Sequence, residues 1–86
     1  MKILICGLGS IGKRHAKNLV HLKQDNLIFF RERNLELTDK KLKTKKVFYS
    51  LNEALKEKPN IAFICNTTEK HIDTALTCAK KNCHLF

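Results

Sequence analysis

The sequence lacks several features that would indicate a membrane protein or a structural metal site. It has no tryptophan, one proline and three glycines. Its longest apolar runs, at residues 3–6, 27–30 and 61–65, are far shorter than the roughly 20 residues of a membrane-spanning helix. No two of its four cysteines have the C-x-x-C spacing of a zinc knuckle or a redox site. We therefore expect no membrane association and no bound metal.

Acidic residues are also scarce, with 8 against 17 basic residues and a net charge of +9. The tightest basic cluster consists of Lys40, Lys41, Lys43, Lys45 and Lys46. Such a patch can attract nucleic acid or an anionic surface. However, a basic run without arginine or aromatic residues is poorly suited to read bases. A solvated lysine-rich surface is the favoured interpretation, and a nucleic-acid-associated module remains the alternative.

The chain has 86 residues, which corresponds to one small domain spanning residues 1–86. The N-terminus leads directly into an apolar run and then into Gly7-Leu8-Gly9, which is unlike a signal-peptide cleavage site. Because free thiols persist in reducing compartments, the sequence predicts a cytoplasmic location.

Short apolar runs alternate with helical patterns along the whole chain. Strands are expected at residues 2–6, 27–31, 46–49, 61–65 and 83–86. Helices are expected at residues 10–22, at residues 50–58 and around residues 72–79, with a weak one at residues 38–42. Strands that alternate with helices through short connections indicate an α/β fold, with a parallel sheet and right-handed crossovers.

Local signals refine three of these elements. Ser50 and Glu53 match a capping box, in which each side chain bonds the other residue's backbone amide. Ile72, Ala75, Leu76 and Ala79 recur at helical spacing and predict the face of the last helix that packs on the sheet. Asn82 is expected to end that helix in the left-handed conformation.

A glycine-rich turn gives the most informative functional signal. Gly7, Gly9 and Gly12 form G-x-G-x-x-G between a strand and a helix, which is the context of a dinucleotide-binding turn. The first glycine makes a tight turn, the second lets a pyrophosphate approach, and the third permits close packing of helix and strand. Ser10 and Ile11 complete the turn at the helix N-terminus, where free amides bind phosphate. These features predict a Rossmann-type sheet of about five strands in the order 3-2-1-4-5.

Dinucleotide-binding folds also place an acid about 20 residues beyond the turn, where it holds the ribose hydroxyls. Glu32 has this spacing after Gly12 and follows the second strand, which favours NAD. Arg31 and Arg33 flank it, and a nearby arginine can hold the 2′-phosphate of NADP. NAD is therefore the predicted cofactor, with NADP as the alternative.

Three stretches resemble the N-terminal half of the Gfo/Idh/MocA oxidoreductases, the glucose–fructose oxidoreductase and inositol dehydrogenase family. The segment 7–15, Gly-Leu-Gly-Ser-Ile-Gly-Lys-Arg-His, resembles the family opening. The segment 64–71, Ile-Cys-Asn-Thr-Thr-Glu-Lys-His, is similar to the family's strand–loop–His segment, although Thr67 replaces a usual proline. The segment 81–86 resembles the A-G-K-H-V that precedes the family's E-K-P motif, with Asn82 and Cys83 in place of Gly-Lys.

The resemblance implies further site residues and an incomplete enzyme. It places Asn66, Thr67, Thr68 and His71 beside the nicotinamide half of the cofactor. It also implies that the E-K-P motif and the sugar-binding domain, which carries the catalytic residues, lie outside this chain. The 86 residues are thus expected to be a truncated cofactor domain of a sugar or cyclitol dehydrogenase. We assign no catalytic residue and expect no turnover from the chain alone.

The remaining candidates carry weaker signals. His15 either lies on the helix surface or contacts the loop after the fourth strand, and His84 with Cys78 and Cys83 makes a poor zinc set. The partners expected are the nicotinamide dinucleotide and the absent substrate domain. A homodimer is also expected, through an open apolar sheet edge at residues 83–86. The alternative function is a non-catalytic NAD-binding or nucleic-acid-associated regulator that uses the lysine cluster.

Overall fold

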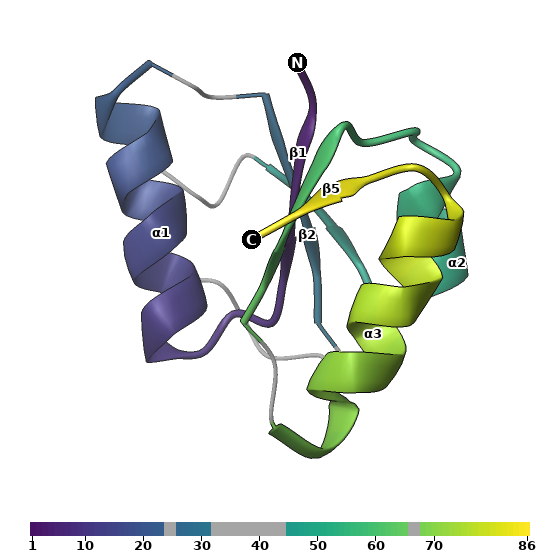
Figure 1. The fold of residues 1–86 in the computed structure, drawn as a ribbon. Helices are drawn as coiled ribbons and strands as arrows, with labels where there is room; N and C mark the ends of the chain where they lie inside the picture. The colour runs from purple at the N-terminus through teal and green to yellow at the C-terminus, as the bar shows by residue number, and fades with distance from the viewer. Residues whose placement is uncertain (24–25, 32–44, 66–67) are drawn as a thin grey trace.

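The computed structural model describes residues 1–23, 26–31, 45–65 and 68–86, which form a sheet with helices on both faces (Figure 1). In chain order the elements are β1 (Ile3–Cys6), α1 (Ser10–His21), β2 (Leu27–Phe30), β3 (Lys46–Phe48), α2 (Leu51–Leu55), β4 (Ile61–Ile64), α3 (Thr68–Lys80) and β5 (His84–Leu85). The observed strands are one or two residues shorter than predicted. The weak helix predicted at residues 38–42 lies outside the described residues.

The five strands are parallel and follow the order β3-β2-β1-β4-β5, as the sequence predicted. In the register of the central strands, Ile5 on β1 lies between Phe29 on β2 and Phe63 on β4. Helix α1 covers one face of the sheet, and α2 and α3 cover the other (Figure 1). Because β2, β1 and β4 are parallel neighbours in the sheet, their carboxyl ends lie side by side.

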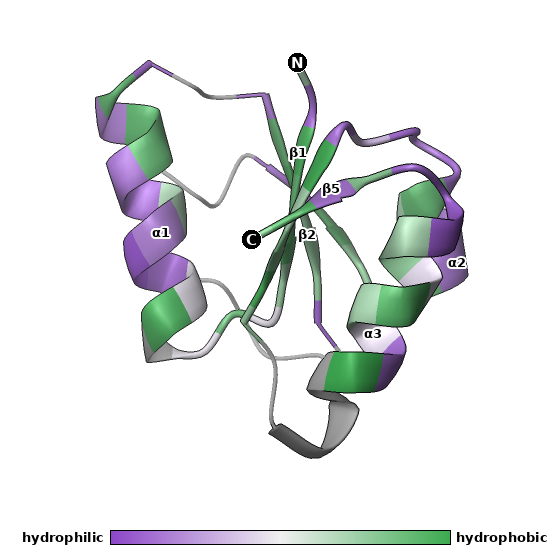
Figure 2. Ribbon diagram, in the orientation of Figure 1, coloured by the Kyte–Doolittle hydropathy of each residue, from purple (hydrophilic) through white to green (hydrophobic). Residues whose placement is uncertain are grey.

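Two apolar clusters, one on each face of the sheet, form the core. On the α1 side, Ile5 and Phe29 are fully buried beneath Ala16. On the other side, Leu4 and Cys6 are fully buried against Cys78 of α3. Every residue of β1 and β2 is buried because both faces of these strands are covered. Figure 2 shows this as hydrophobic central strands flanked by helices of mixed hydropathy.

The predicted packing face of the last helix is wrong for three of its four residues, since Ala75 packs against the core but Ile72, Leu76 and Ala79 are exposed. Thr74 and Cys78 are buried, whereas Ile72 and Leu76 are 72% and 56% exposed. The helix is therefore rotated so that small side chains meet the sheet. Small residues let a helix approach a sheet closely, which the larger Ile72 and Leu76 would prevent.

The second helix begins where the sequence predicted, but without the predicted capping box. Ser50 is the N-cap residue in an extended conformation, yet its hydroxyl makes no capping hydrogen bond. Glu53 instead accepts a hydrogen bond from Nζ of Lys56 at 3.1 Å, one turn further along. An exposed ion pair on the helix surface thus replaces the reciprocal bond. The left-handed Asn82 is confirmed, with a φ of 63°.

Candidate functional site

The turn between β1 and α1 starts with a glycine in a conformation that favours glycine. Gly7 has a φ of 96°, which side chains with a Cβ rarely adopt. Its N–H donates a hydrogen bond to the carbonyl oxygen of Phe30 at 2.7 Å. The turn is therefore fixed against the end of β2, the neighbouring strand.

Gly12 holds α1 close to this turn. A Cβ at Gly12 would lie 2.0 Å from the carbonyl oxygen of Gly7 and 3.6 Å from the Cβ of Cys65. No side chain can occupy that space, because the nearest atom belongs to the backbone. Close packing of helix and strand is the role that the sequence predicted for the third glycine, and this geometry confirms it.

Gly9 has the opposite surroundings. A Cβ at Gly9 would meet no heavy atom within 4 Å. Gly9 is the N-cap residue of α1, and its carbonyl accepts a hydrogen bond from the N–H of Lys13 at 3.0 Å. The first amides of a helix have no partner within the helix and carry the positive end of its dipole. Open space beside these amides fits a phosphate group, and the residues of the turn therefore fit a dinucleotide.

Three neighbouring strands end at this turn. Besides the bond between Gly7 and Phe30, the N–H of Cys65 donates to the carbonyl oxygen of Cys6 at 2.8 Å. The ends of β2, β1 and β4 are thus linked to one another at a single edge. In open α/β sheets, ligands bind outside the carboxyl ends of the strands, where the strand order reverses. β1, at which the order reverses here, leads directly into the glycine turn.

The four cysteines are free thiols, and Cys6 and Cys65 are the two at the carboxyl ends of β1 and β4. A side-chain hydrogen bond with Cys78 and burial raise the pKa of the Cys6 thiol, and burial raises the pKa of Cys65 and Cys83. The Cys83 thiol donates to the carbonyl oxygen of Pro59 at 3.3 Å. Protonated, buried thiols are poor nucleophiles and poor metal ligands. Among the described residues, no group of three ligating side chains could hold a metal ion.

His15 contacts the fourth strand itself rather than the loop that follows it, which was one of the two predicted positions. Its ring lies 5.3 Å from that of Phe63 on β4, and Phe63 stacks on Phe86 at 5.4 Å. The contact is with the strand itself. It fixes the rotation of α1 relative to the sheet.

The predicted site residues divide into three groups. Gly7, Gly9, Ser10, Ile11 and Gly12 come together in the turn and the first turn of α1, where Ile11 is 62% exposed. Glu32, Arg33, Asn66 and Thr67 lie outside the described residues. Thr68 and His71 belong to the first turn of α3, and their side chains lie outside the described part of the structure.

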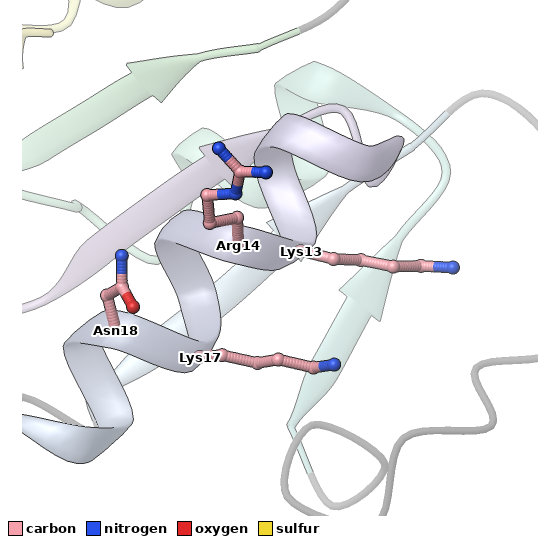
Figure 3. A pocket seen from close by; sticks show the side chains of 4 residues that line it. All are labelled: Lys13, Arg14, Lys17 and Asn18. Atoms are coloured by element: carbon pink, nitrogen blue, oxygen red, sulfur yellow. The ribbon is translucent and has the colours of Figure 1, made fainter.

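A basic cavity on α1 was not predicted from the sequence. A cavity of about 390 Å³ is lined by Lys13, Arg14, Lys17 and Asn18 (Figure 3). The sequence spacing indicated two adjacent rows, because residues four positions apart are neighbours on a helix: Lys13 with Lys17, and Arg14 with Asn18.

No helix in the described part of the chain has the length and apolar character needed to cross a membrane. Comparison with known proteins then identifies the chain's relatives. A myo-inositol 2-dehydrogenase from Thermotoga maritima is 33% identical over 93 residues, which cover 100% of this chain and 27% of that enzyme. The chain thus spans about a quarter of the relative's length. No solved structure matches it.

The family model of the Gfo/Idh/MocA oxidoreductases, described as "Oxidoreductase family, NAD-binding Rossmann fold", matches residues 1–86. This match covers the glycine turn, all five strands and the three stretches on which the sequence resemblance was based. Together with the strand order and the geometry of Gly7, Gly9 and Gly12, it establishes that the chain belongs to the Gfo/Idh/MocA oxidoreductase family as its NAD-binding Rossmann domain.

Proposed function

We propose that this domain binds NAD for a hydride transfer between the cofactor and a sugar or cyclitol in the intact enzyme. The observation that carries the proposal is the open space at Gly9, next to the N-terminal amides of α1. The relative's activity as a myo-inositol 2-dehydrogenase supports a cyclitol-type substrate. The substrate-binding and catalytic groups are proposed to lie in the remaining part of such an enzyme, and the predicted cytoplasmic location is kept as part of the proposal.

Each predicted residue has a proposed role toward the cofactor. The backbone amides of the turn residues donate hydrogen bonds to the pyrophosphate. Glu32, with Arg33 beside it, accepts hydrogen bonds from the adenosine ribose hydroxyls. Asn66, Thr67, Thr68 and His71 follow β4 and line the nicotinamide side. When bound, the nicotinamide accepts or donates the hydride. The domain itself binds and orients the dinucleotide.

A titration with NADH tests this proposal through Gly9→Ala. The added methyl group would fill the open space that we assign to the pyrophosphate, so we expect binding to weaken about tenfold or more, since charge-assisted hydrogen bonds to the phosphate are lost. The circular dichroism spectrum should stay unchanged, because the methyl group meets no atom of the protein. Glu32→Ala should weaken NADH binding as well. Equal affinity of wild type and Gly9→Ala, or no binding to wild type, would contradict the proposal.

The nucleic-acid alternative draws no support from the described part of the lysine cluster. Lys46 is exposed and pairs with Glu57 at 3.8 Å. Glu57 also pairs with Lys2, at 3.6 Å. A surface cation that is partly neutralised in this way is typical of a solvated lysine-rich face.

We also propose that the chain forms a homodimer through β5. This strand is last in the sheet order and pairs with β4 alone among the described strands. Leu85 and Phe86 are 41% and 71% exposed there. Because exposed apolar edge strands pair with other chains, we expect a dimer that forms as concentration rises, measured by light scattering after size exclusion. Leu85→Lys should shift the equilibrium to monomer, and a wild type that stays monomeric at high concentration would contradict this proposal.

A further inference from the structure

The rotation of α1 determines which side chains face the adenosine end of the site. Its buried side carries Gly12 and Ala16. His15 contacts Phe63 and therefore marks the flank nearest β4. Residues two positions apart on an α-helix differ by about 200° in direction. Lys13 consequently lies on the opposite flank.

That opposite flank faces β2. The sheet order places β2 and β4 on either side of β1, so a side chain that faces away from β4 faces toward β2. Lys13 is half-buried, unlike the exposed Arg14 beside it. This burial fits an aliphatic stem of Lys13 that packs along the flank of the helix. Figure 3 shows Lys13 and Lys17 extending to one side of α1, away from Arg14 and Asn18.

Lys13 is also held close to the phosphate-binding turn. Its N–H donates to the carbonyl oxygen of Gly9, so its backbone belongs to the first turn of the helix. The bond from Gly7 to Phe30 fixes the end of β2 against the same turn. In dinucleotide-binding folds, the end of the second strand is where the 2′ position of the adenosine ribose binds. The ammonium group of Lys13 is therefore on the side of α1 that faces this position.

The described side chains along this part of α1 are positively charged. No acidic residue occurs in the first turn of α1, and the cavity on this helix is lined by three cationic residues and one amide, without an acid. Within the described part of the chain, Lys13 has no ion pair. Lys17 has an interaction of its own, so the inference does not depend on it.

From these observations we infer that Lys13 is a specificity-determining residue that pairs with the 2′-phosphate of NADP(H), so that the domain binds NADPH as well as NADH. The inference rests on the proposed dinucleotide-binding function and deepens it. A phosphate monoester carries nearly two negative charges, and its pairing with an ammonium group is a charge-assisted hydrogen bond. NADH lacks this phosphate and cannot make the contact. The role proposed above for Glu32 toward the ribose hydroxyls concerns NADH, so the two residues together would allow both cofactors to bind.

Calorimetric titrations with NADH, NADPH and adenosine 2′,5′-bisphosphate test the inference. For Lys13→Ala we expect about a tenfold loss of affinity for NADPH and for the bisphosphate, and less than a twofold change for NADH. Lys80→Ala is the matched control, because it removes the same charge from the end of α3, on the other face of the sheet. It should change none of the three affinities by more than twofold. Lys13→Gln, which keeps the length of the stem, should behave like Lys13→Ala.

The outcomes separate this inference from the proposed function. Wild type that binds NADH but not NADPH would overturn the inference and leave the proposed function intact. Lys13→Ala that weakens both cofactors equally, or neither, would do the same, because the lysine would then not distinguish them. Wild type that binds neither cofactor would overturn the proposed function and the inference with it. A selective loss with NADPH and the bisphosphate supports both.

Discussion

Replacing Gly12 by alanine is expected to destabilise the domain by about 3 kcal/mol or more and to leave it largely unfolded near its present melting temperature. The new Cβ would lie 2.0 Å from the carbonyl oxygen of Gly7 and 3.0 Å from its carbonyl carbon. Both atoms are backbone, and no rotamer change can relieve the contact. Gly7 itself cannot move freely, because its N–H is bonded to Phe30 and its φ is already positive.

Thermal unfolding followed by circular dichroism measures this effect. A loss of 1 kcal/mol lowers the melting temperature of a domain of this size by about 4–8 °C, so Gly12→Ala should melt at least about 12 °C lower. Gly9→Ala is the matched control. It adds the same methyl group in the same turn, at a residue with a φ of −73°. The added Cβ would have no heavy atom within 4 Å. Its melting temperature should change little. If the two variants melt within about 2 °C of each other, α1 does not pack against the turn as described.

The glycine turn shows how much of the backbone structure could be predicted from the sequence. The roles of Gly7 and Gly12 followed from their spacing between a strand and a helix, because a backbone that approaches this closely leaves no room for a Cβ. The parallel sheet followed from the alternation of apolar runs with helical patterns, and the strand order followed from the Rossmann-type glycine turn. Both results depend on backbone geometry, which the sequence pattern constrains strongly.

Side-chain details were less predictable. Helix α3 has two apolar stripes, one with Ile72 and Leu76 and one with Ala75 and Cys78, and periodicity alone does not say which one meets the sheet. The space between helix and sheet decides, and that space depends on elements far away in the sequence. The hydroxyl of Ser50 shows the same limit. Its capping bond competes with water and with the pairing of Glu53 and Lys56, which a motif does not reveal.

The second large effect is expected in the core, where Phe29→Ala should cost about 3–5 kcal/mol. Phe29 is fully buried in the cluster beneath α1 and lies between Ile5 and Val47 in the sheet. Removing the ring loses apolar burial and leaves a cavity that the rigid strands on both sides cannot close. Urea unfolding should show a lower midpoint. Leu22→Ala, which truncates a residue that is 67% exposed at the end of α1, should change stability by less than about 0.5 kcal/mol.

Phe29 also supports the site, and this gives the variant a second readout. The residue precedes Phe30, whose carbonyl oxygen holds the turn through Gly7. A ligand that binds the folded state stabilises it by about 2.7 kcal/mol at a hundred times its dissociation constant. Saturating NADH should therefore raise the melting temperature of Phe29→Ala by about 10 °C or more, recovering much of the loss. A variant as stable as wild type without cofactor would show that Phe29 does not fill the core on the α1 side. A destabilised variant that NADH cannot recover would show that the loss of the ring disrupts the glycine turn itself.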